Sequence, residues 1–312
     1  MYFYGPVPSR RLGFSLGVDL IPKKVCSFDC VYCHVARTTQ KTAGQFSYVK
    51  LPQFTKELKA TIAKKPQLDY ITISGSGEPT LHKNLDKIIG IIKQTTKNRY
   101  PVCVITNSSL LYRKSVRRAL RRADLIIPSL DAATPRVFEK INRPLKGITI
   151  DKIINGLIRL RKEFKGKIWL EIMVVRGIND TLDEAFRLRE AVAKIKPDKV
   201  QLNIPVRPAW ADIALPDKER VREIAKIIGG NIEIIARFNK KPRKQSGGDA
   251  ANVIIEFLKR RPANLSDLEK TLGISRLRLN RSLRDLISRG KIKEKMAHGE
   301  KYFIFCGAKN KI

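Results

Sequence analysis

Three of the five cysteines in this 312-residue chain stand close together, at Cys26, Cys30 and Cys33. Three cysteines within eight residues, with the other two isolated, are not the pattern of a disulfide framework in a chain of this length. The spacing lets one loop wrap three thiolates around a single metal centre. Structural zinc takes four ligands, whereas three thiolates on a four-iron cluster leave one iron open for a substrate or cofactor. A zinc site with His34 as the fourth ligand is the alternative.

A second candidate for chemistry is the glycine-rich run Ser74-Gly75-Ser76-Gly77-Glu78-Pro79-Thr80-Leu81. Its glycines allow the backbone to approach a ligand closely. The carboxylate of Glu78 can pair with an ammonium group. A Gly-Ser-Gly run alone is a weak signal, but this one ends the strand that follows the cysteine loop. The combination therefore favours a shared site.

The surrounding sequence predicts the elements that position both motifs. Apolar and β-branched runs predict strands at 16–20, 70–74, 102–106, 125–128, 168–175 and 200–204. Amphipathic patterns predict helices at 55–64, 85–93, 113–122, 151–163, 182–193 and 217–228. This repeated alternation predicts an α/β fold with parallel strands and crossover helices. In such folds the functional loops gather at the carboxyl ends of the strands.

Polar residues stand at the ends of several predicted strands, where they could line the mouth of such a fold. They are Asn107, Ser129, Asp131, Asn179 and Asn203. Asn, Asp and Ser are also common in turns and helix caps, which is the alternative for each of them. Their recurrence at successive strand ends favours a binding role.

The alternation of strands and helices stops at 237–248, where a proline and a glycine pair replace the periodic apolar positions. We therefore predict a first domain at 1–236, a linker at 237–248 and a second domain at 249–312. Within the second domain the sequence predicts helices at 249–259, 265–272 and 276–288, and a hairpin at 291–295 and 301–305. That order of elements is typical of a winged helix-turn-helix, a small α+β domain.

The chain is strongly basic, because 63 Lys and Arg against 29 Asp and Glu give a net charge of +34. Such a field attracts polyanions, and nucleic acid is the first candidate partner. A Lys-rich surface suited to heat is the alternative, although thermophile surfaces usually balance Lys with Glu. The predicted helix at 113–122 carries one continuous basic stripe, formed by Lys114, Arg117, Arg118, Arg121 and Arg122. In the second domain, the arginines suited to phosphate contacts include Arg276, Arg278 and Arg281.

Composition also limits the class of protein. With 43% hydrophobic and 29% charged residues, the chain is ordinary for a globular protein. No apolar run approaches the roughly 18 residues of a membrane span, and the first residues lack the basic and apolar regions of a signal peptide. We therefore expect a cytoplasmic protein without a membrane partner. No feature of the sequence predicts an oligomeric state.

The sequence resembles the radical S-adenosylmethionine (radical SAM) superfamily. The resemblance rests on C-x-x-x-C-x-aromatic-C, with Tyr32 as the aromatic residue, and on residues 74–81, which are similar to that family's Gly-Gly-Glu loop. It covers roughly residues 7–235 and implies a partial β/α barrel of six strand–helix units. It also implies reductive cleavage of S-adenosylmethionine, with one electron from a donor such as a ferredoxin or a flavodoxin. The resulting 5′-deoxyadenosyl radical abstracts a hydrogen atom from the substrate.

The same resemblance implies roles for individual residues. Cys26, Cys30 and Cys33 would ligate one [4Fe-4S] cluster, whose open iron binds the amino and carboxyl groups of S-adenosylmethionine. Glu78 would hold the ammonium group, and Tyr32 would sit beside the adenine. Ser129 and Asp131 would be candidates for the ribose hydroxyls. The other residues expected around the cofactor are Gly75, Ser76, Gly77, Asn107, Asn179 and Asn203.

Within the superfamily, four segments resemble uncharacterised iron–sulfur oxidoreductases related to tRNA 4-demethylwyosine synthase. They are residues 5–13, 15–19, 74–81 and Asn142-Arg143-Pro144. That relative uses a second cluster held by upstream cysteines. Here no cysteine precedes Cys26, and we expect Cys103 and Cys306 to be buried in strands. The sequence therefore predicts a single cluster.

Functions from different classes are compatible with these motifs. The first is a radical SAM oxidoreductase that acts on RNA, above all tRNA, with the winged helix as an accessory binding module. The second is a redox-sensing iron–sulfur regulator whose winged helix binds DNA. A third is an activase that installs a radical on a partner protein, although such partners are not usually polyanions. The Gly-Ser-Gly-Glu loop favours an enzyme, because a sensor has no need for an ammonium-binding carboxylate.

Overall fold

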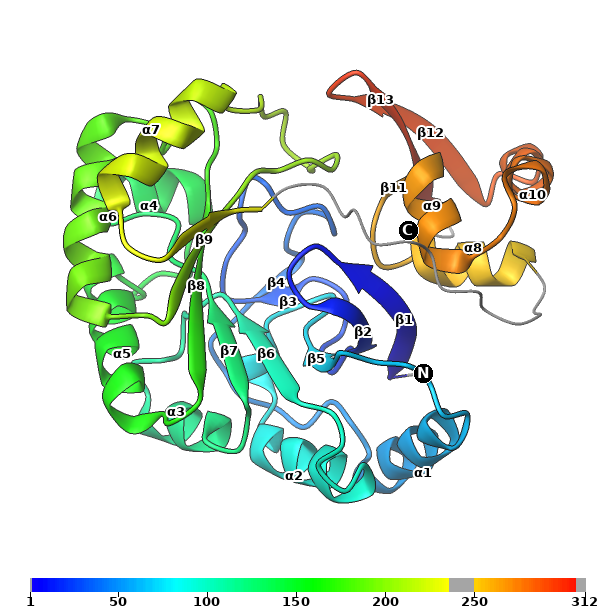
Figure 1. The fold of residues 1–312 in the computed structure, drawn as a ribbon, viewed down its shortest axis with the longest axis horizontal. Helices are drawn as coiled ribbons and strands as arrows, with labels where there is room; N and C mark the ends of the chain where they lie inside the picture. The colour runs from blue at the N-terminus through cyan, green and yellow to red at the C-terminus, as the bar shows by residue number, and fades with distance from the viewer. Residues whose placement is uncertain (1, 236–249, 307–312) are drawn as a thin grey trace.

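The computed structural model describes residues 2–235 and 250–306, so the predicted linker at 237–248 lies outside the described residues. Eight strands of the described part form one sheet (Figure 1). In spatial order they are β1 (Phe3–Ser9), β2 (Gly13–Val18), β5 (Tyr70–Ile73), β6 (Val102–Thr106), β7 (Leu125–Pro128), β8 (Lys167–Met173), β9 (Lys199–Asn203) and β10 (Ile232–Ile234). Only the pair of β1 and β2 is antiparallel among them. Since β1 and β10 do not pair with each other, the sheet is open.

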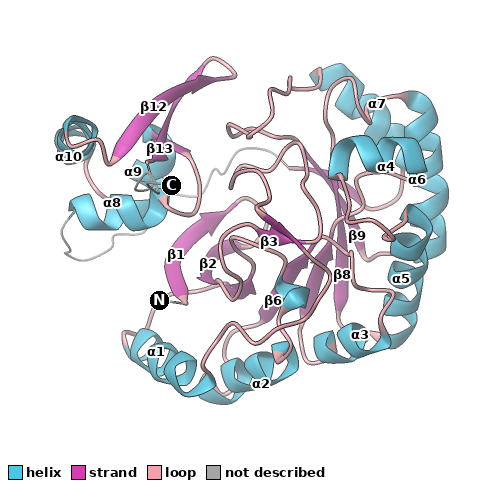
Figure 2. Ribbon diagram, turned by 180° about the vertical axis from the view of Figure 1, so that it is seen from behind, coloured by secondary structure: helices cyan, strands magenta, loops and turns pink. Residues whose placement is uncertain are grey.

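Helices cover the outer face of this sheet (Figure 2). Those of the first 235 residues are α1 (Leu51–Ala63), α2 (Leu85–Thr95), α3 (Lys114–Leu120), α4 (Pro135–Asn142), α5 (Ile150–Glu163), α6 (Leu182–Ile195) and α7 (Lys218–Ile228). The predicted α/β fold with a mostly parallel sheet is therefore confirmed. α1 starts earlier than predicted, because Pro52 is well tolerated in the first turn of a helix. None of the helices in the described ranges has the length and apolar character needed to cross a bilayer.

Two strands of the eight-stranded sheet and one α-helix on its outer face are absent from the sequence-based prediction. β1 contains Pro6 and Pro8, which interrupt a strand pattern because proline cannot donate to a ladder. β1 can hold both because it is an edge strand. β10 and α4 are short, with three and eight residues, so their periodicity is weak.

Alternate residues of the strands face the helices or the concave side of the sheet. On β6, Val102 and Val104 pack into the main core beneath the helices. Between them, Cys103 joins Leu125 and Ile127 in a smaller cluster. Cys103 is buried in its strand, as predicted.

The remaining elements form what we call the C-terminal unit, residues 250–306. Its elements are α8 (Ala250–Leu258), β11 (Ala263–Asn264), α9 (Leu265–Leu272), α10 (Arg276–Ser288), β12 (Ile292–Ala297) and β13 (Glu300–Phe305). The strands form an antiparallel sheet in the order β11-β13-β12. The apolar core of this unit includes Ile254, Leu268 and Phe303, and it extends to Val7 on β1. The three predicted helices and the hairpin are present, while Cys306 follows β13 and is only half-buried.

Candidate active site

The three clustered cysteines lie in the long connection that follows the carboxyl end of β2. Cys26 belongs to β3 (Val25–Cys26), which pairs with β4 (Gln40–Lys41) as a two-stranded ribbon. The amide of Cys33 donates to the carbonyl oxygen of Cys30 at 3.1 Å and closes a tight turn. Taken as whole residues, all three cysteines are half-buried. One loop at the edge expected for function therefore carries the three sulfur atoms.

Each of the three sulfur atoms accepts a hydrogen bond from a different side-chain nitrogen. The pairs are Asn107 Nδ2 to Cys26 Sγ at 3.5 Å, Asn142 Nδ2 to Cys30 Sγ at 3.4 Å, and Lys24 Nζ to Cys33 Sγ at 3.2 Å. Donors aimed at sulfur stabilise the thiolate form, and such hydrogen bonds also tune iron–sulfur clusters. The donor set therefore fits a cluster held by three thiolates.

Two of the thiols are hard to ionise without a metal. Burial, and then the charge of Glu78, raises the pKa of Cys26 to about 12. Burial, and then the charge of Asp131, raises the pKa of Cys30 well above its ordinary value. A metal centre must displace these protons, so its binding depends on pH. In the described part of the chain no three Cys, His, Asp or Glu side chains converge on a single ion, whereas a four-iron cluster meets each thiolate at a separate iron.

The predicted Gly-Ser-Gly-Glu loop is joined directly to the cysteine loop. The amide of Lys24 donates to the carbonyl oxygen of Ser76 at 2.8 Å, and the amide of Glu78 donates to that of Val25 at 3.2 Å. A Cβ atom on Gly77 would stand 2.2 Å from the Val25 carbonyl oxygen, so only glycine allows this approach. The two predicted motifs therefore form one site.

A carboxylate that the sequence analysis did not single out supports the glycine loop from below. Asp19 accepts hydrogen bonds from the amide and the hydroxyl of Ser76, at 3.1 and 2.6 Å. A Cβ atom on Gly75 would stand 2.3 Å from an oxygen of the same carboxylate, and the φ of Gly75 is +150°. Asp19 therefore holds Ser76 by two hydrogen bonds and packs closely against Gly75, so it fixes the shape of this part of the loop.

The carboxylate of Glu78 is buried and accepts four hydrogen bonds. Its Oε1 receives the amide and hydroxyl of Thr80, at 3.0 and 2.6 Å, and the hydroxyl of Thr106 at 2.6 Å. Its Oε2 receives only the amide of Asn107, at 2.7 Å. Burial raises the pKa of Glu78, and these hydrogen bonds oppose the shift. Among the described residues no Lys or Arg pairs with this carboxylate, so it is a buried negative charge that a cation would stabilise.

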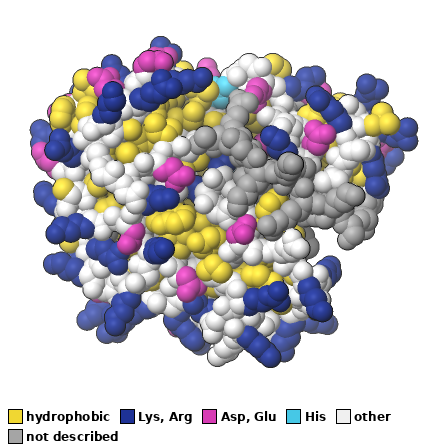
Figure 3. Space-filling model, viewed as in Figure 1, with side chains coloured by type: hydrophobic (Ala, Val, Ile, Leu, Met, Phe, Trp, Pro, Cys, Tyr) yellow, Lys and Arg dark blue, Asp and Glu magenta, His cyan; other side chains and the backbone are white. Residues whose placement is uncertain are grey.

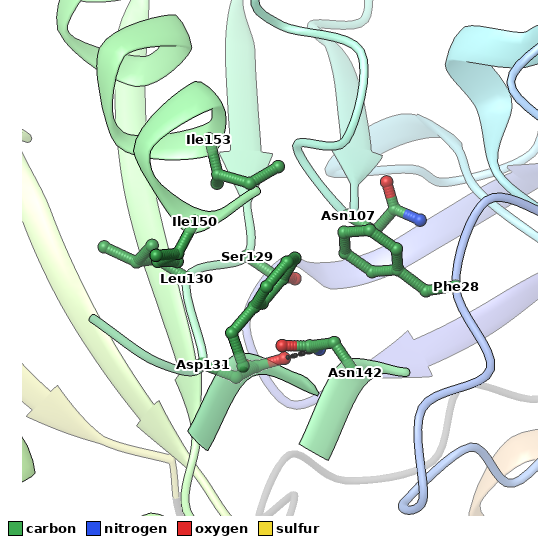
Figure 4. Close-up of a pocket in the computed structure, with 9 residues that line it drawn as sticks. Phe28, Asn107, Ser129, Leu130, Asp131, Asn142, Ile150 and Ile153 are labelled. Atoms are coloured by element: carbon green, nitrogen blue, oxygen red, sulfur yellow. Dashed lines mark hydrogen bonds between the residues drawn. The ribbon is translucent and has the colours of Figure 1, made fainter. Parts of the chain in front are cut away.

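Asp131 organises the opposite side of the cysteine loop. Its carboxylate accepts hydrogen bonds from the Tyr32 hydroxyl at 2.5 Å, from Asn142 Nδ2 at 2.7 Å and from the Met173 amide at 2.9 Å. Burial raises its pKa, while the hydrogen bond from Tyr32 opposes the shift. Asp131 and Asn142 lie together in a small pocket whose lining also includes Ser129 (Figure 4). Asp131 therefore fixes Tyr32 and Asn142, and no oxygen of its carboxylate lacks a partner.

The other predicted cofactor residues occupy different positions. Ser129 and Asn107 line the pocket of Figure 4. The side-chain amide nitrogen of Asn179 donates to the carbonyl oxygens of Asp131 and Met173, both at 2.7 Å. Its side-chain oxygen accepts from the backbone amide of Val175 at 2.7 Å. Asn179 therefore supports the backbone beneath Asp131. Asn203 is buried and lies 3.5 Å from a carboxylate oxygen of Glu171.

The basic stripe predicted on α3 is interrupted. Arg117 is buried, and its guanidinium donates to Glu163 Oε1 at 2.9 Å and to the carbonyl oxygens of Leu111 and Tyr112. The prediction that Arg117 belongs to a continuous exposed stripe is wrong, because α5 supplies an acidic partner that the local pattern does not contain. The exposed predicted cations are Lys114, Arg118, Arg121, Arg122, Arg276, Arg278 and Arg281. In Figure 3, Lys and Arg side chains lie around most of the edge of the visible face, with fewer of them near its centre.

Three further side chains touch the cysteine loop and were not identified as site residues from the sequence. Lys24 and Asn142 donate to sulfur atoms, as described above. Trp210 donates from Nε1 to the Cys30 carbonyl oxygen at 2.8 Å and from its amide to the Cys33 carbonyl oxygen at 3.3 Å. Asn142 had a signal, since it stands in the Asn-Arg-Pro run, and Lys24 is two residues from Cys26 in the sequence. Trp210 reaches the loop through folding alone.

Comparison with known proteins identifies the superfamily. The profile described as the radical SAM superfamily matches residues 20–189, which is more than half of the chain. The UPF0026 protein of Methanocaldococcus jannaschii is 37% identical over 236 residues, 75% of this chain and 72% of that protein. A Brachyspira hyodysenteriae protein named GTPase Obg is 38% identical over 300 residues, 95% of this chain. This chain spans only 44% of the length of that relative.

More distant relatives agree with this result. A probable dual-specificity RNA methyltransferase RlmN of Thermotoga sp. (strain RQ2) is 25% identical over 233 residues, 72% of this chain and 63% of that protein. The solved structure of a radical SAM methyltransferase from Sphaerobacter thermophilus matches with a TM-score of 0.53 over 70% of this chain and 65% of that chain. At 16% identity that likeness concerns the fold alone. The chain therefore belongs to the radical SAM superfamily, whose members are enzymes that use a [4Fe-4S] cluster and S-adenosylmethionine.

Proposed function

We propose that this chain holds one [4Fe-4S] cluster through Cys26, Cys30 and Cys33 and cleaves S-adenosylmethionine reductively in order to modify RNA, above all tRNA. The observation that supports this most is the direct joining of two loops. The cysteine loop, with a donor on each sulfur, is hydrogen-bonded through its backbone to the loop that carries the buried carboxylate of Glu78. We also propose a ferredoxin or a flavodoxin as the electron donor.

When bound, the cluster and S-adenosylmethionine supply a 5′-deoxyadenosyl radical that abstracts hydrogen from the substrate. The chain's own residues would hold and orient the cluster and S-adenosylmethionine. Lys24, Asn107 and Asn142 direct N–H groups at the thiolates, which stabilises their negative charge. With three protein thiolates, one iron is left for the methionine moiety.

Glu78 supplies the charge that orients the methionine moiety in this proposal. Its carboxylate is buried without a cationic partner in the described chain, so an ammonium group offsets the cost of its burial. Oε2 accepts a single hydrogen bond and has capacity for another donor. The amide of Asn107 holds that oxygen while its side chain reaches toward Cys26. Asn107 therefore couples the ammonium site to the cluster site.

We assign the adenosine to the side of the loop where Tyr32 and Ser129 lie. The Tyr32 hydroxyl donates to Asp131, whose carboxylate is also held by Asn142, so the ring is held in one orientation beside the adenine. The Ser129 hydroxyl, at the half-buried end of β7, is a donor or acceptor for the ribose. Asp131 acts through Tyr32 in this assignment, because three donors already occupy its oxygens.

RNA as the substrate is supported by charge and by one relative. The net charge of +34 favours a polyanion, and the Thermotoga relative is named as an RNA methyltransferase. We propose that residues 249–312 form a winged helix-turn-helix that adds RNA affinity through Arg276, Arg278 and Arg281 on α10. In that division, residues 1–236 are the radical SAM domain and 237–248 the linker. We also propose that this chain belongs with the iron–sulfur oxidoreductases related to tRNA 4-demethylwyosine synthase. Unlike that synthase, it would hold a single cluster.

The test uses the full chain reconstituted with iron and sulfide without oxygen. Reduced protein with S-adenosylmethionine should release 5′-deoxyadenosine, and tRNA from cells that lack this protein should increase the rate. Mass spectrometry of the nucleosides should then reveal one new mass. Release of 5′-deoxyadenosine without any change in RNA would leave the radical chemistry and refute the RNA substrate. Sequence-specific binding of duplex DNA without cleavage would instead support a redox-sensing regulator.

A further inference from the structure

A second pocket lies where the C-terminal unit meets the first 235 residues. The unit stands beside β1 (Figure 1), and the pocket lies between α9, the turn after β1 and the segment after β9. Its charged lining residues are Arg10, Arg207, Arg261, Lys270, Asp267 and Glu300. Four cations against two acids give this lining a net charge of +2. We call it the arginine pocket.

The guanidinium groups of this pocket are incompletely paired. Within the described residues, Arg10 Nη1 and Arg207 Nε are buried and have no hydrogen-bond partner. Arg207 has one ion pair, a long contact of 3.6 Å to Asp267. The other acid, Glu300, accepts hydrogen bonds from Asn264 at 2.8 Å and from Tyr302 at 3.3 Å. Within the described residues, Arg10 Nη1 and Arg207 Nε therefore remain unsatisfied although two carboxylates line the pocket.

Burying several positive charges close together without anions costs free energy, and this cost lowers their pKa values. Burial, and then the charge of Arg207, lowers the pKa of Arg10 to about 9. The same two causes, in the same order, lower the pKa of Arg261 to about 10. An anion between these groups would offset both the burial and the mutual repulsion.

The first turn of α9 adds to the positive field. Ser266 and Asp267 in that turn line the pocket, and Asn264 caps the helix by accepting the Asp267 amide at 2.7 Å. The amino end of a helix carries partial positive charge and unpaired N–H groups. Oxygen anions with several acceptors suit such a combination of helix end and arginine forks, and phosphate is the common biological example.

The segment after β9 links this pocket to the cysteine loop. Its Val206 accepts a hydrogen bond from the Tyr302 hydroxyl at 2.7 Å, at the pocket. Trp210, three residues beyond Arg207, donates to the carbonyl oxygens of Cys30 and Cys33. Three residues span at most about 11 Å. The pocket and the cysteine loop are therefore neighbours on one side of the molecule. A ligand anion held in the pocket would thus stand close to the site where the radical is generated, without occupying it.

We infer that the arginine pocket binds a phosphodiester group of the RNA substrate and so holds the strand beside the cysteine loop. The inference rests on the proposed function for the identity of the molecule that carries the phosphate. It assigns RNA positioning to the junction of the C-terminal unit and the sheet, where neither the α3 cations nor the α10 arginines lie.

The test compares two double variants of the full chain. Arg10→Met with Arg207→Met removes two guanidinium groups of the pocket while keeping side-chain length. Arg187→Met with Arg222→Met is the matched control, since both arginines are more than half exposed on α6 and α7. Filter binding of tRNA at several salt concentrations should show about tenfold weaker binding than the wild type for the pocket variant. The control variant should bind like the wild type. Its log–log salt slope should fall by about 0.7–0.9 for each phosphate that the variant no longer neutralises.

Inorganic phosphate provides a readout that does not depend on RNA. It should raise the melting temperature of the wild type, relative to potassium chloride at equal ionic strength, and raise that of the pocket variant less. If the wild type shows this effect but binds no RNA, the anion site stands and the RNA proposal fails. Equal RNA binding and equal phosphate response in both double variants would refute the arginine pocket as a phosphate site. If the pocket variant does not fold, Lys270→Gln tests the same expectations from α9.

Discussion

Replacement of Glu78 by Gln tests the arrangement of the site most directly, because the substitution keeps shape and removes charge. Three donors converge on Oε1, from Thr80 and Thr106, so the amide oxygen of the new side chain must take that place. Its NH₂ group then replaces Oε2 and faces the amide of Asn107, which is also a donor. One backbone N–H is left without an acceptor, at a cost of about 1–3 kcal/mol in the free energy of unfolding.

The loss in cofactor binding has a separate cause and a similar expected magnitude. A hydrogen bond to a charged group contributes about 1.5–3 kcal/mol. Removal of the negative charge opposite the ammonium group should therefore raise the Kd of S-adenosylmethionine by a factor of about 10 to 150. Thr80→Val is the matched control, since it deletes one neutral donor to Oε1 and leaves the charge of Glu78 in place. We expect it to cost about 1 kcal/mol of stability with a Kd close to that of the wild type.

Both quantities can be measured on reconstituted protein without oxygen. Equilibrium dialysis gives the Kd of S-adenosylmethionine, and urea unfolding of the same samples gives the stability. Glu78→Gln should change both values, whereas Thr80→Val should change only the stability. Unaltered affinity in Glu78→Gln, or equal losses of affinity in the two variants, would refute the assignment of Glu78 to the ammonium group.

Four other predictions concern the cluster and the surface. Cys26→Ala should abolish iron retention, while Cys103→Ala should leave it unchanged, as iron analysis after anaerobic reconstitution will show. Lys24→Met should lower the midpoint potential of the cluster in a redox titration followed by electron paramagnetic resonance, because the sulfur of Cys33 loses a cationic donor. Arg117→Met should destabilise the fold at pH 7. Hydrogen bonds from Arg117 lower the pKa of Glu163, so this difference should shrink as the pH falls below about 4.5, which thermal unfolding at several pH values can check. Arg118→Met, at an exposed position on the same helix, should leave stability unchanged and reduce the salt slope of RNA binding by about 0.7–0.9.

The parts of the protein that depend on local pattern were predictable from the sequence. The spacing of Cys26, Cys30 and Cys33 places three cysteines in one loop without reference to any other residue. The strands and helices that carry the fold have apolar periods that can be seen within a short window. The glycine before Glu78 was also predictable from the local sequence, because a close backbone approach at Gly77 requires glycine. Even there, only the structure shows that the approaching atom is the carbonyl oxygen of Val25.

Tertiary structure decided which side chains meet, since residues far apart in the chain come together only when strands and helices pack. Asn107, directly after β6, and Asn142, at the end of α4, reach two sulfur atoms. Glu163 on α5 pairs with Arg117 and so removes it from the predicted basic stripe. The arginine pocket has the same origin. Arg10 and Arg207 are almost 200 residues apart, and each alone is one basic residue among 63. The net charge can be counted from the sequence alone. A binding site depends on the distances between its side chains, and for residues far apart in the chain these distances are set only by folding.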